Sequence, residues 1–102
     1  LKEIDEEQLA VEPERIKEIK ATVASLRLDA VAAEGFGTSR SKMVREIRGE
    51  RVKLNWKPVS NPAVGISEGD VLSIRGRGRV VVSQVGGTTR KGRIGVVLHR
   101  YF

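Results

Sequence analysis

Two short helical patterns, separated by a glycine-bounded turn, constrain the fold of this chain more than any other feature. They lie between residues 25 and 49 of the 102-residue sequence. In the first pattern, Leu28, Val31 and Ala32 share one helical face. Ser25 is a suitable N-cap, and Gly35 is expected to end the helix in the left-handed conformation. A strand pattern follows the second helix, so the segment predicts two short packed helices next to a sheet.

The second helical pattern ends at Gly49 and combines a narrow apolar stripe with a wide basic face. Thr38 or Ser39 is expected to cap its start. Free backbone N–H groups in the first turn of a helix attract phosphate, and nearby cations add to this attraction. The apolar stripe consists of Met43, Val44 and Ile47. The polar residues around it form a candidate phosphate-binding face, and they are Ser39, Arg40, Ser41, Lys42, Arg45 and Arg48.

The charge of the chain is unevenly distributed. Residues 1–24 contain four basic and seven acidic side chains, whereas residues 25–102 contain fifteen basic and six acidic ones. A domain with such a positive excess favours a polyanionic partner, with nucleic acid first and an anionic membrane surface second. A basic charge that serves only solubility is the plainer alternative.

The first 24 residues are expected to be an acidic linker followed by a helix. Pro13 suits the first position of that helix, and Ile16, Ile19 and Val23 fall on one helical face. Because the sequence begins at Leu1, we expect an upstream domain to precede it, with residues 25–102 forming a separate domain. The chain contains no long apolar run and no signal-peptide pattern, so no membrane insertion is expected.

Residues 51–57 alternate between apolar and polar side chains. This alternation predicts one half-buried strand with Val52, Leu54 and Trp56 on the same side and Lys53 on the other. Trp56 is the only tryptophan. It is either an aromatic residue of the core or its rim, or a platform on which an unpaired base stacks.

The last third of the chain is expected to be β-structure. Residues 68–70 form a turn, and residues 71–75 form a strand. Residues 75–79, with the sequence RGRGR, are expected to be a bend whose arginines are available to phosphate. Residues 80–85 and 93–100 flank a glycine-rich segment and predict a hairpin with a basic tip.

Catalytic and metal-binding patterns are weak. The chain has no cysteine and one histidine, His99, without ligand spacing around it. Ser39 and Lys42 have the S-x-x-K spacing of certain acyl-transfer enzymes, but the other signatures of that class are missing. We therefore predict no enzyme activity, no catalytic residue, no metal and no cofactor.

Several motifs together resemble the S-four RNA-binding domain (S4 domain). These are RLD at 27–29, SRSK at 39–42, VKLN at 52–55 and EGD at 68–70, followed by VLSIRG. The longer pattern is similar to the C-terminal module of the photosystem II S4-domain proteins of cyanobacteria and plastids. The resemblance implies an α+β fold in which two short helices pack on a small, bent, mostly antiparallel sheet. An N-terminal helical extension and a C-terminal β-hairpin would complete it.

The resemblance also implies that the start of the second helix and the following strand line the RNA surface. Asp29 is expected to be a structural cap or an ion-pair partner, and Arg27 either contacts RNA or braces the first helix. The predicted RNA-binding residues are Arg27, Ser39, Arg40, Ser41, Lys42, Arg45, Arg48, Lys53, Asn55, Lys57, Arg75, Arg77 and Arg79.

The sequence thus predicts a non-catalytic module that recognises ribosomal or transfer RNA mainly through phosphate contacts. The ribosome is a further expected partner, and the expected location is the cytoplasm or the plastid stroma. Two alternatives stay open. One is a protein-interaction or assembly module related to photosystem II, and the other is an accessory domain of an RNA-modifying enzyme.

Overall fold

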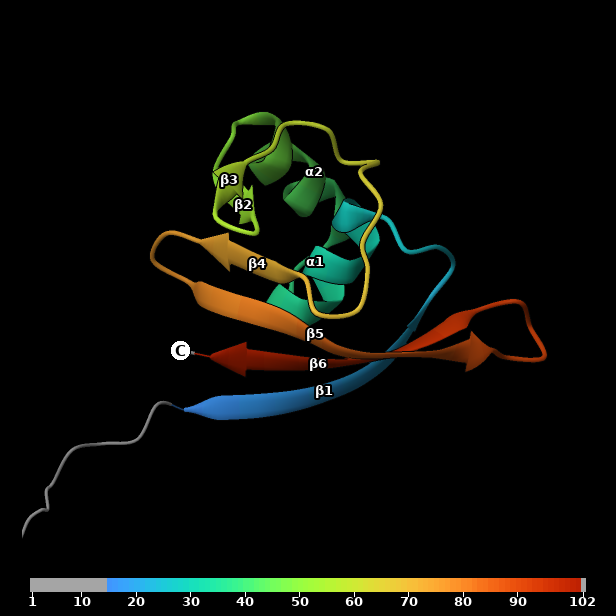
Figure 1. The fold of residues 1–102 in the computed structure, drawn as a ribbon. Coiled ribbons are helices and arrows are strands. Elements are labelled where there is room, and N and C mark those ends of the chain that lie inside the picture. Colours follow the sequence, from blue (N-terminus) through green and yellow to red (C-terminus); the bar gives the residue numbers. More distant parts are fainter. Residues whose placement is uncertain (1–14, 102) are drawn as a thin grey trace, which may run out of the picture.

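Two short helices lie on one face of a six-stranded sheet in the computed structural model, which describes residues 15–101 (Figure 1). All paired strands are antiparallel, in the order β1-β6-β5-β4-β2-β3. This arrangement confirms the expected α+β fold. The elements are β1 (Ile16–Val23), α1 (Leu28–Phe36), α2 (Arg40–Arg48), β2 (Val52–Leu54), β3 (Lys57–Pro58), β4 (Val71–Ile74), β5 (Gly78–Thr88) and β6 (Ile94–Tyr101).

The expected N-terminal helical extension is wrong for the described part of the chain, because residues 16–23 form strand β1. This strand pairs with β6 along its whole length. Ile19, Ala21 and Val23 are turned inward while the residues between them are exposed, which is the period of two of a strand. β1 therefore belongs to the same sheet as the rest of the chain, and the expected division after residue 24 does not separate it. Pro13 and the acidic linker lie outside the described residues.

Helix α1 begins and ends later than expected. Backbone carbonyls of the loop between β3 and β4 cap its start: Leu28 N–H donates to Val64 O at 2.9 Å and Asp29 N–H to Pro62 O at 3.1 Å. Ser25 is therefore not the N-cap, which is Arg27. At the other end, the left-handed residue is Gly37, with φ 66°, and not Gly35. The loop carbonyls of Pro62 and Val64 thus replace the side-chain cap that the sequence suggested.

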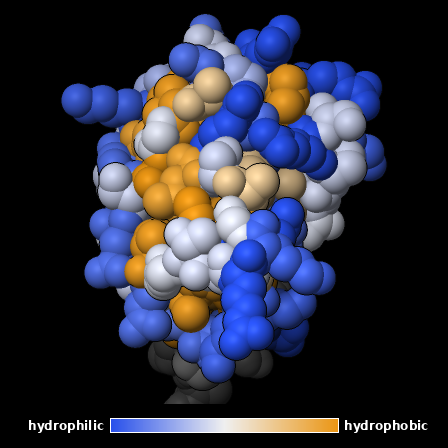
Figure 2. Space-filling view, turned by 90° about the vertical axis from the view of Figure 1, so that its right-hand side faces the viewer, coloured by the Kyte–Doolittle hydropathy of each residue, from blue (hydrophilic) through white to orange (hydrophobic). Residues whose placement is uncertain are grey.

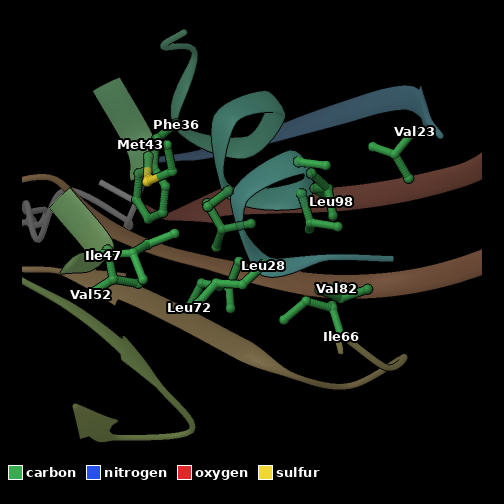
Figure 3. Packing of buried hydrophobic residues seen from close by; sticks show 14 of the residues in the cluster. Val23, Leu28, Phe36, Met43, Ile47, Val52, Ile66, Leu72, Val82 and Leu98 are labelled. Carbon is green, nitrogen blue, oxygen red and sulfur yellow. The ribbon is translucent and has the colours of Figure 1, made fainter. Parts of the chain in front are cut away.

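Helix α2 matches the prediction closely. Ser39 is its N-cap, since the Ser39 side chain accepts a hydrogen bond from Lys42 N–H at 3.1 Å, and Gly49 is its C-cap. Met43 and Ile47 are fully buried. They belong to one core cluster with apolar residues of α1 and of the inner sheet face. Figure 3 shows Met43 beside Phe36 and Ile47 beside Val52, with Leu28, Leu72, Val82 and Leu98 farther along the same cluster.

The segment after α2 is a tight hairpin, so the expected single strand over residues 51–57 is wrong. Leu54 pairs with Lys57, which leaves Asn55 and Trp56 as a two-residue turn. Their φ angles are 51° and 71°. Positive φ at both positions is the geometry of a type I′ turn, which here connects β2 to β3. Trp56 is 64% exposed and does not share the buried side of Val52.

The C-terminal half follows the prediction. The turn at residues 68–70, strand β4 and the hairpin of β5 and β6 are all present. The bend expected over residues 75–79 covers only residues 75–77, because β5 begins at Gly78. β5 is longer than expected, and its tip extends beyond the helices (Figure 1). The side of the molecule that carries this tip shows apolar surface bordered by hydrophilic side chains (Figure 2).

Candidate nucleic-acid interface

A buried carboxylate fixes two of the predicted RNA-binding arginines. Asp29 is 2% exposed. Its Oδ1 and Oδ2 each lie 3.2 Å from a guanidinium nitrogen of Arg27, and Oδ2 lies 3.3 Å from Nε of Arg40. Oδ1 also accepts a hydrogen bond from Ala30 N–H at 2.8 Å. The expectation that Asp29 is an ion-pair partner is confirmed. Because a single carboxylate faces two guanidinium groups, the three side chains together have a net charge of +1.

The two arginines stay accessible despite these contacts. The Arg27 side chain is 43% exposed and the Arg40 side chain is 49% exposed. A guanidinium has five N–H donors, so contact with one carboxylate leaves donors for another anion. Asp29 therefore orients Arg27 and Arg40 at the surface next to the start of α2.

The outer face of α2 is polar and basic. Its first turn contains no acidic residue, and the side turned away from Met43 and Ile47 is exposed. The aligned peptide dipoles give the start of the helix a partial positive charge, which favours a bound anion there. We call this exposed surface the α2 basic face, and it consists of Ser41, Lys42, Arg45 and Arg48.

Asn55 occupies a structural position. Its Oδ1 accepts a hydrogen bond from Val71 N–H at 2.9 Å, and its Nδ2 donates to Asp70 Oδ1 at 3.1 Å. Asp70 Oδ2 in turn accepts from Ser67 N–H at 2.8 Å. The side chain therefore ties the β2–β3 turn to the turn that precedes β4.

A groove of about 750 Å³ brings other predicted residues together. It lies beside the β2–β4 ladder, in which Lys53 is the register partner of Ser73. Arg75 and Arg77 approach it from the bend after β4, and Trp56 from the turn after β2. We call it the Trp56 groove, and its basic and aromatic lining consists of Arg51, Lys53, Trp56, Arg75 and Arg77.

Arg51 is the one basic residue of this lining that is not among the predicted RNA-binding residues. It follows α2 directly, and its Nη1 lies 3.2 Å from Oε2 of Glu46. The signal that could have indicated Arg51 is its place at the start of the alternating segment 51–57, near Lys53. The side chain is 68% exposed, so this ion pair leaves it accessible.

Arg79, Lys57 and Arg48 do not contact the Asp29 carboxylate, and they occupy different elements. Arg79 neighbours the buried Val80 on β5, so it is turned to the sheet face opposite the helices, where its guanidinium lies 4.4 Å from the centroid of the Tyr101 ring. Lys57 is exposed on β3, and Arg48 is exposed in the last turn of α2. The predicted residues therefore occupy more than one face.

Other chemical signals have structural explanations. The Ser39 hydroxyl of the S-x-x-K pattern accepts the backbone N–H of Lys42, which is the arrangement of a helix cap. His99 Nε2 lies 3.4 Å from Oε2 of Glu18 on the neighbouring strand. Residues 15–101 contain no group of three or more histidine, cysteine or acidic side chains that is able to hold a metal ion. No helix of the same region has the length and apolar character needed to cross a membrane.

Comparison with known proteins gives a family match and two relatives. The S4 domain family model matches residues 26–72. The ribosome-associated protein quality control protein P2 of Bacillus subtilis is 44% identical over 79 residues, which covers 78% of this chain and 31% of that protein. The small ribosomal subunit protein uS4 of Desulfotalea psychrophila is 37% identical over 70 residues, which covers 65% of this chain and 33% of that protein.

A crystal structure of pseudouridylate synthase is also similar. It shares 40% sequence identity, covers 49% of this chain and 22% of the other, and has a TM-score of 0.46. The chain spans about a third of the length of the two curated relatives.

Proposed function

Because residues 26–72 of this chain form an S4 domain, an RNA-binding module, we propose that the chain recognises structured RNA through phosphate contacts and catalyses no reaction. The observation that carries this proposal is the α2 basic face next to the two arginines that Asp29 orients. Exposed cations on a helix are able to contact phosphates, and such contacts fix the orientation of a bound nucleic acid without reading its sequence.

The proposed ligand is ribosomal RNA, with transfer RNA as the second candidate. The names of both curated relatives support this choice, since one is ribosome-associated and the other is a protein of the small ribosomal subunit. A cytoplasmic location and a place within a longer protein, after an upstream domain, belong to the same proposal. Binding to the ribosome itself would follow from binding to its RNA.

Fluorescence anisotropy with labelled ribosomal RNA hairpins and transfer RNA, measured across a salt series, tests the proposal. Four to six phosphate contacts predict a slope of log K against log salt of about −3 to −5, at about −0.7 per contact for single strands to about −0.9 for duplex regions. The test variant is Lys42→Glu with Arg45→Glu. Arg40 is left unchanged, because its contact with Asp29 links it to folding.

The matched control is Arg90→Glu with Lys91→Glu, which makes the same charge change at the exposed tip between β5 and β6. We expect the α2 variant to lose most of the affinity and the control to lose much less. Equal losses would mean that only net charge matters and that the α2 basic face is not the site.

A third result would contradict RNA binding altogether. If wild type binds none of these RNAs at low salt, but retains a protein partner after nuclease treatment, the chain is an assembly module. The resemblance to photosystem II proteins would then become the leading guide to that partner.

A further inference from the structure

Trp56 has a conformation and an exposure that do not serve the fold. Its φ of 71° lies in the left-handed region, where a side chain with a Cβ atom is strained, and glycine is the usual residue at this second position of a type I′ turn. The indole is also 64% exposed and lies outside the core cluster. A strained backbone and an exposed aromatic ring together are unfavourable for stability, so the ring points to a role in binding.

The surroundings of the ring are cationic. Arg51, Lys53, Arg75 and Arg77 line the same groove, together with the two carboxylates of Glu46 and Glu50. One of these carboxylates pairs with Arg51. The groove therefore has an excess of positive charge beside an accessible aromatic face.

An aromatic face among cations is the arrangement that binds single-stranded nucleic acid. Bases in a duplex have both faces covered by stacking, whereas an unpaired base can stack on an aromatic side chain while its phosphates contact arginine and lysine. We propose that the Trp56 groove binds an unpaired nucleotide of the RNA, with its base stacked on Trp56 and its flanking phosphates near Arg75 and Arg77. This inference rests on the proposed RNA-binding function and adds a second subsite, separate from the α2 basic face.

The fluorescence of Trp56 gives a direct test, because the chain contains a single tryptophan. The probes are a six-nucleotide single-stranded RNA and an abasic oligonucleotide of the same length and charge. We expect the single-stranded RNA to quench the fluorescence as it saturates, and the abasic chain to bind without comparable quenching. Equal quenching by both probes would overturn the stacking contact.

Substitution at Trp56 provides a second readout. Trp56→Gly removes the ring and suits the turn, so its denaturation midpoint should be no lower than that of wild type. We expect its affinity for the single-stranded RNA to fall about 5- to 150-fold, the effect of losing one stacked base. Trp56→Phe should restore most of that affinity. A stable glycine variant with unchanged affinity would refute the proposal.

The charged part of the groove is tested with Arg75→Gln and Arg77→Gln, and with Arg90→Gln as the control at the distant β5–β6 tip. The first two should each reduce the salt dependence of single-strand binding, and the control should reduce it less. Equal effects at all three positions would show that phosphates do not lie near the groove.

Failure of this inference is distinguishable from failure of the proposed function. If the α2 variant loses structured RNA while Trp56→Gly binds single-stranded RNA like wild type, the function stands and the groove is not a nucleotide site. If wild type binds no RNA at low salt, the proposed function and the Trp56 nucleotide site are both wrong. If an acidic peptide quenches Trp56 and RNA does not, the groove binds protein, and the inference is wrong.

Discussion

Asp29 holds Arg40 across the junction of the two helices, with Oδ2 of Asp29 3.3 Å from Nε of Arg40. Asp29 is almost fully buried at the start of α1, whereas the Arg40 side chain is half exposed at the start of α2. The contact therefore joins a buried anchor to a surface cation. Its two members are eleven residues apart in the sequence, so it also fixes the turn between the helices.

Replacement of Asp29 by alanine should destabilise the fold. The change removes the hydrogen bonds to Arg27, Arg40 and the N–H of Ala30. Because both arginines are half exposed and able to regain water, we expect a loss of about 1–3 kcal/mol in the free energy of unfolding. Urea denaturation measures it, with Glu34→Ala on the exposed side of α1 as control. An Asp29→Ala midpoint equal to that of the control would show that the cluster does not contribute to stability.

Replacement of Gly35 by alanine should force α1 away from β5. The added Cβ would lie 2.9 Å from Cγ1 and 3.0 Å from Cγ2 of Val80, a stiff and fully buried side chain. Overpacking of this kind costs about 1–3 kcal/mol. Thermal unfolding tests it against Gly65→Ala, where a Cβ meets no atom within 4 Å.

Measuring Gly35→Ala in a protein that also carries Val80→Ala identifies the cause of its loss of stability. If the clash with Val80 is responsible, Gly35→Ala should cost less in a Val80→Ala protein than in wild type, because the opposing methyl groups are gone. The same cost in both backgrounds would place the effect elsewhere in the helix.

Replacement of Asn55 should weaken the connection between two turns. Asn55→Ala removes the bonds to Asp70 and Val71 and leaves a non-glycine residue at φ 51°. We expect a loss of about 1–3 kcal/mol. Asn55→Gly loses the same bonds but relaxes the backbone, so it should be less destabilised than alanine. Chemical denaturation measures the stability of both variants. If Asn55→Gly is less stable than Asn55→Ala, the backbone argument is wrong.

The sequence predicted best those elements whose signals are local. Helix α2 has its cap at Ser39, its C-terminal glycine at Gly49 and a helical apolar period in Met43 and Ile47, and all three lie within eleven residues. Asp29 was likewise expected to be a structural cap or an ion-pair partner, and its contact with Arg27 spans two residues. Each of these features depends on residues close together in the chain.

The sequence predicted least well those elements that depend on distant partners. Residues 16–23 fit a helical face as well as a strand, and pairing with β6, near the other end of the chain, determines the outcome. The alternation of Val52, Leu54 and Trp56 continues through a turn that it does not reveal. Sequence alone also could not assign the basic residues to faces, since Arg79 and the α2 basic face lie on different sides of the sheet. The RNA contacts and the photosystem resemblance stay predictions.

The pairing of β1 with β6 has a mechanical consequence. Ile16, where β1 begins, is the register partner of Tyr101, where β6 ends. Tension applied at these two positions would open the ladder like a zipper, one pair of residues at a time. Tension between Ile16 and Ile94, at opposite ends of the same ladder, would load its hydrogen bonds together in shear. Single-molecule pulling should therefore find a lower rupture force for the first attachment than for the second.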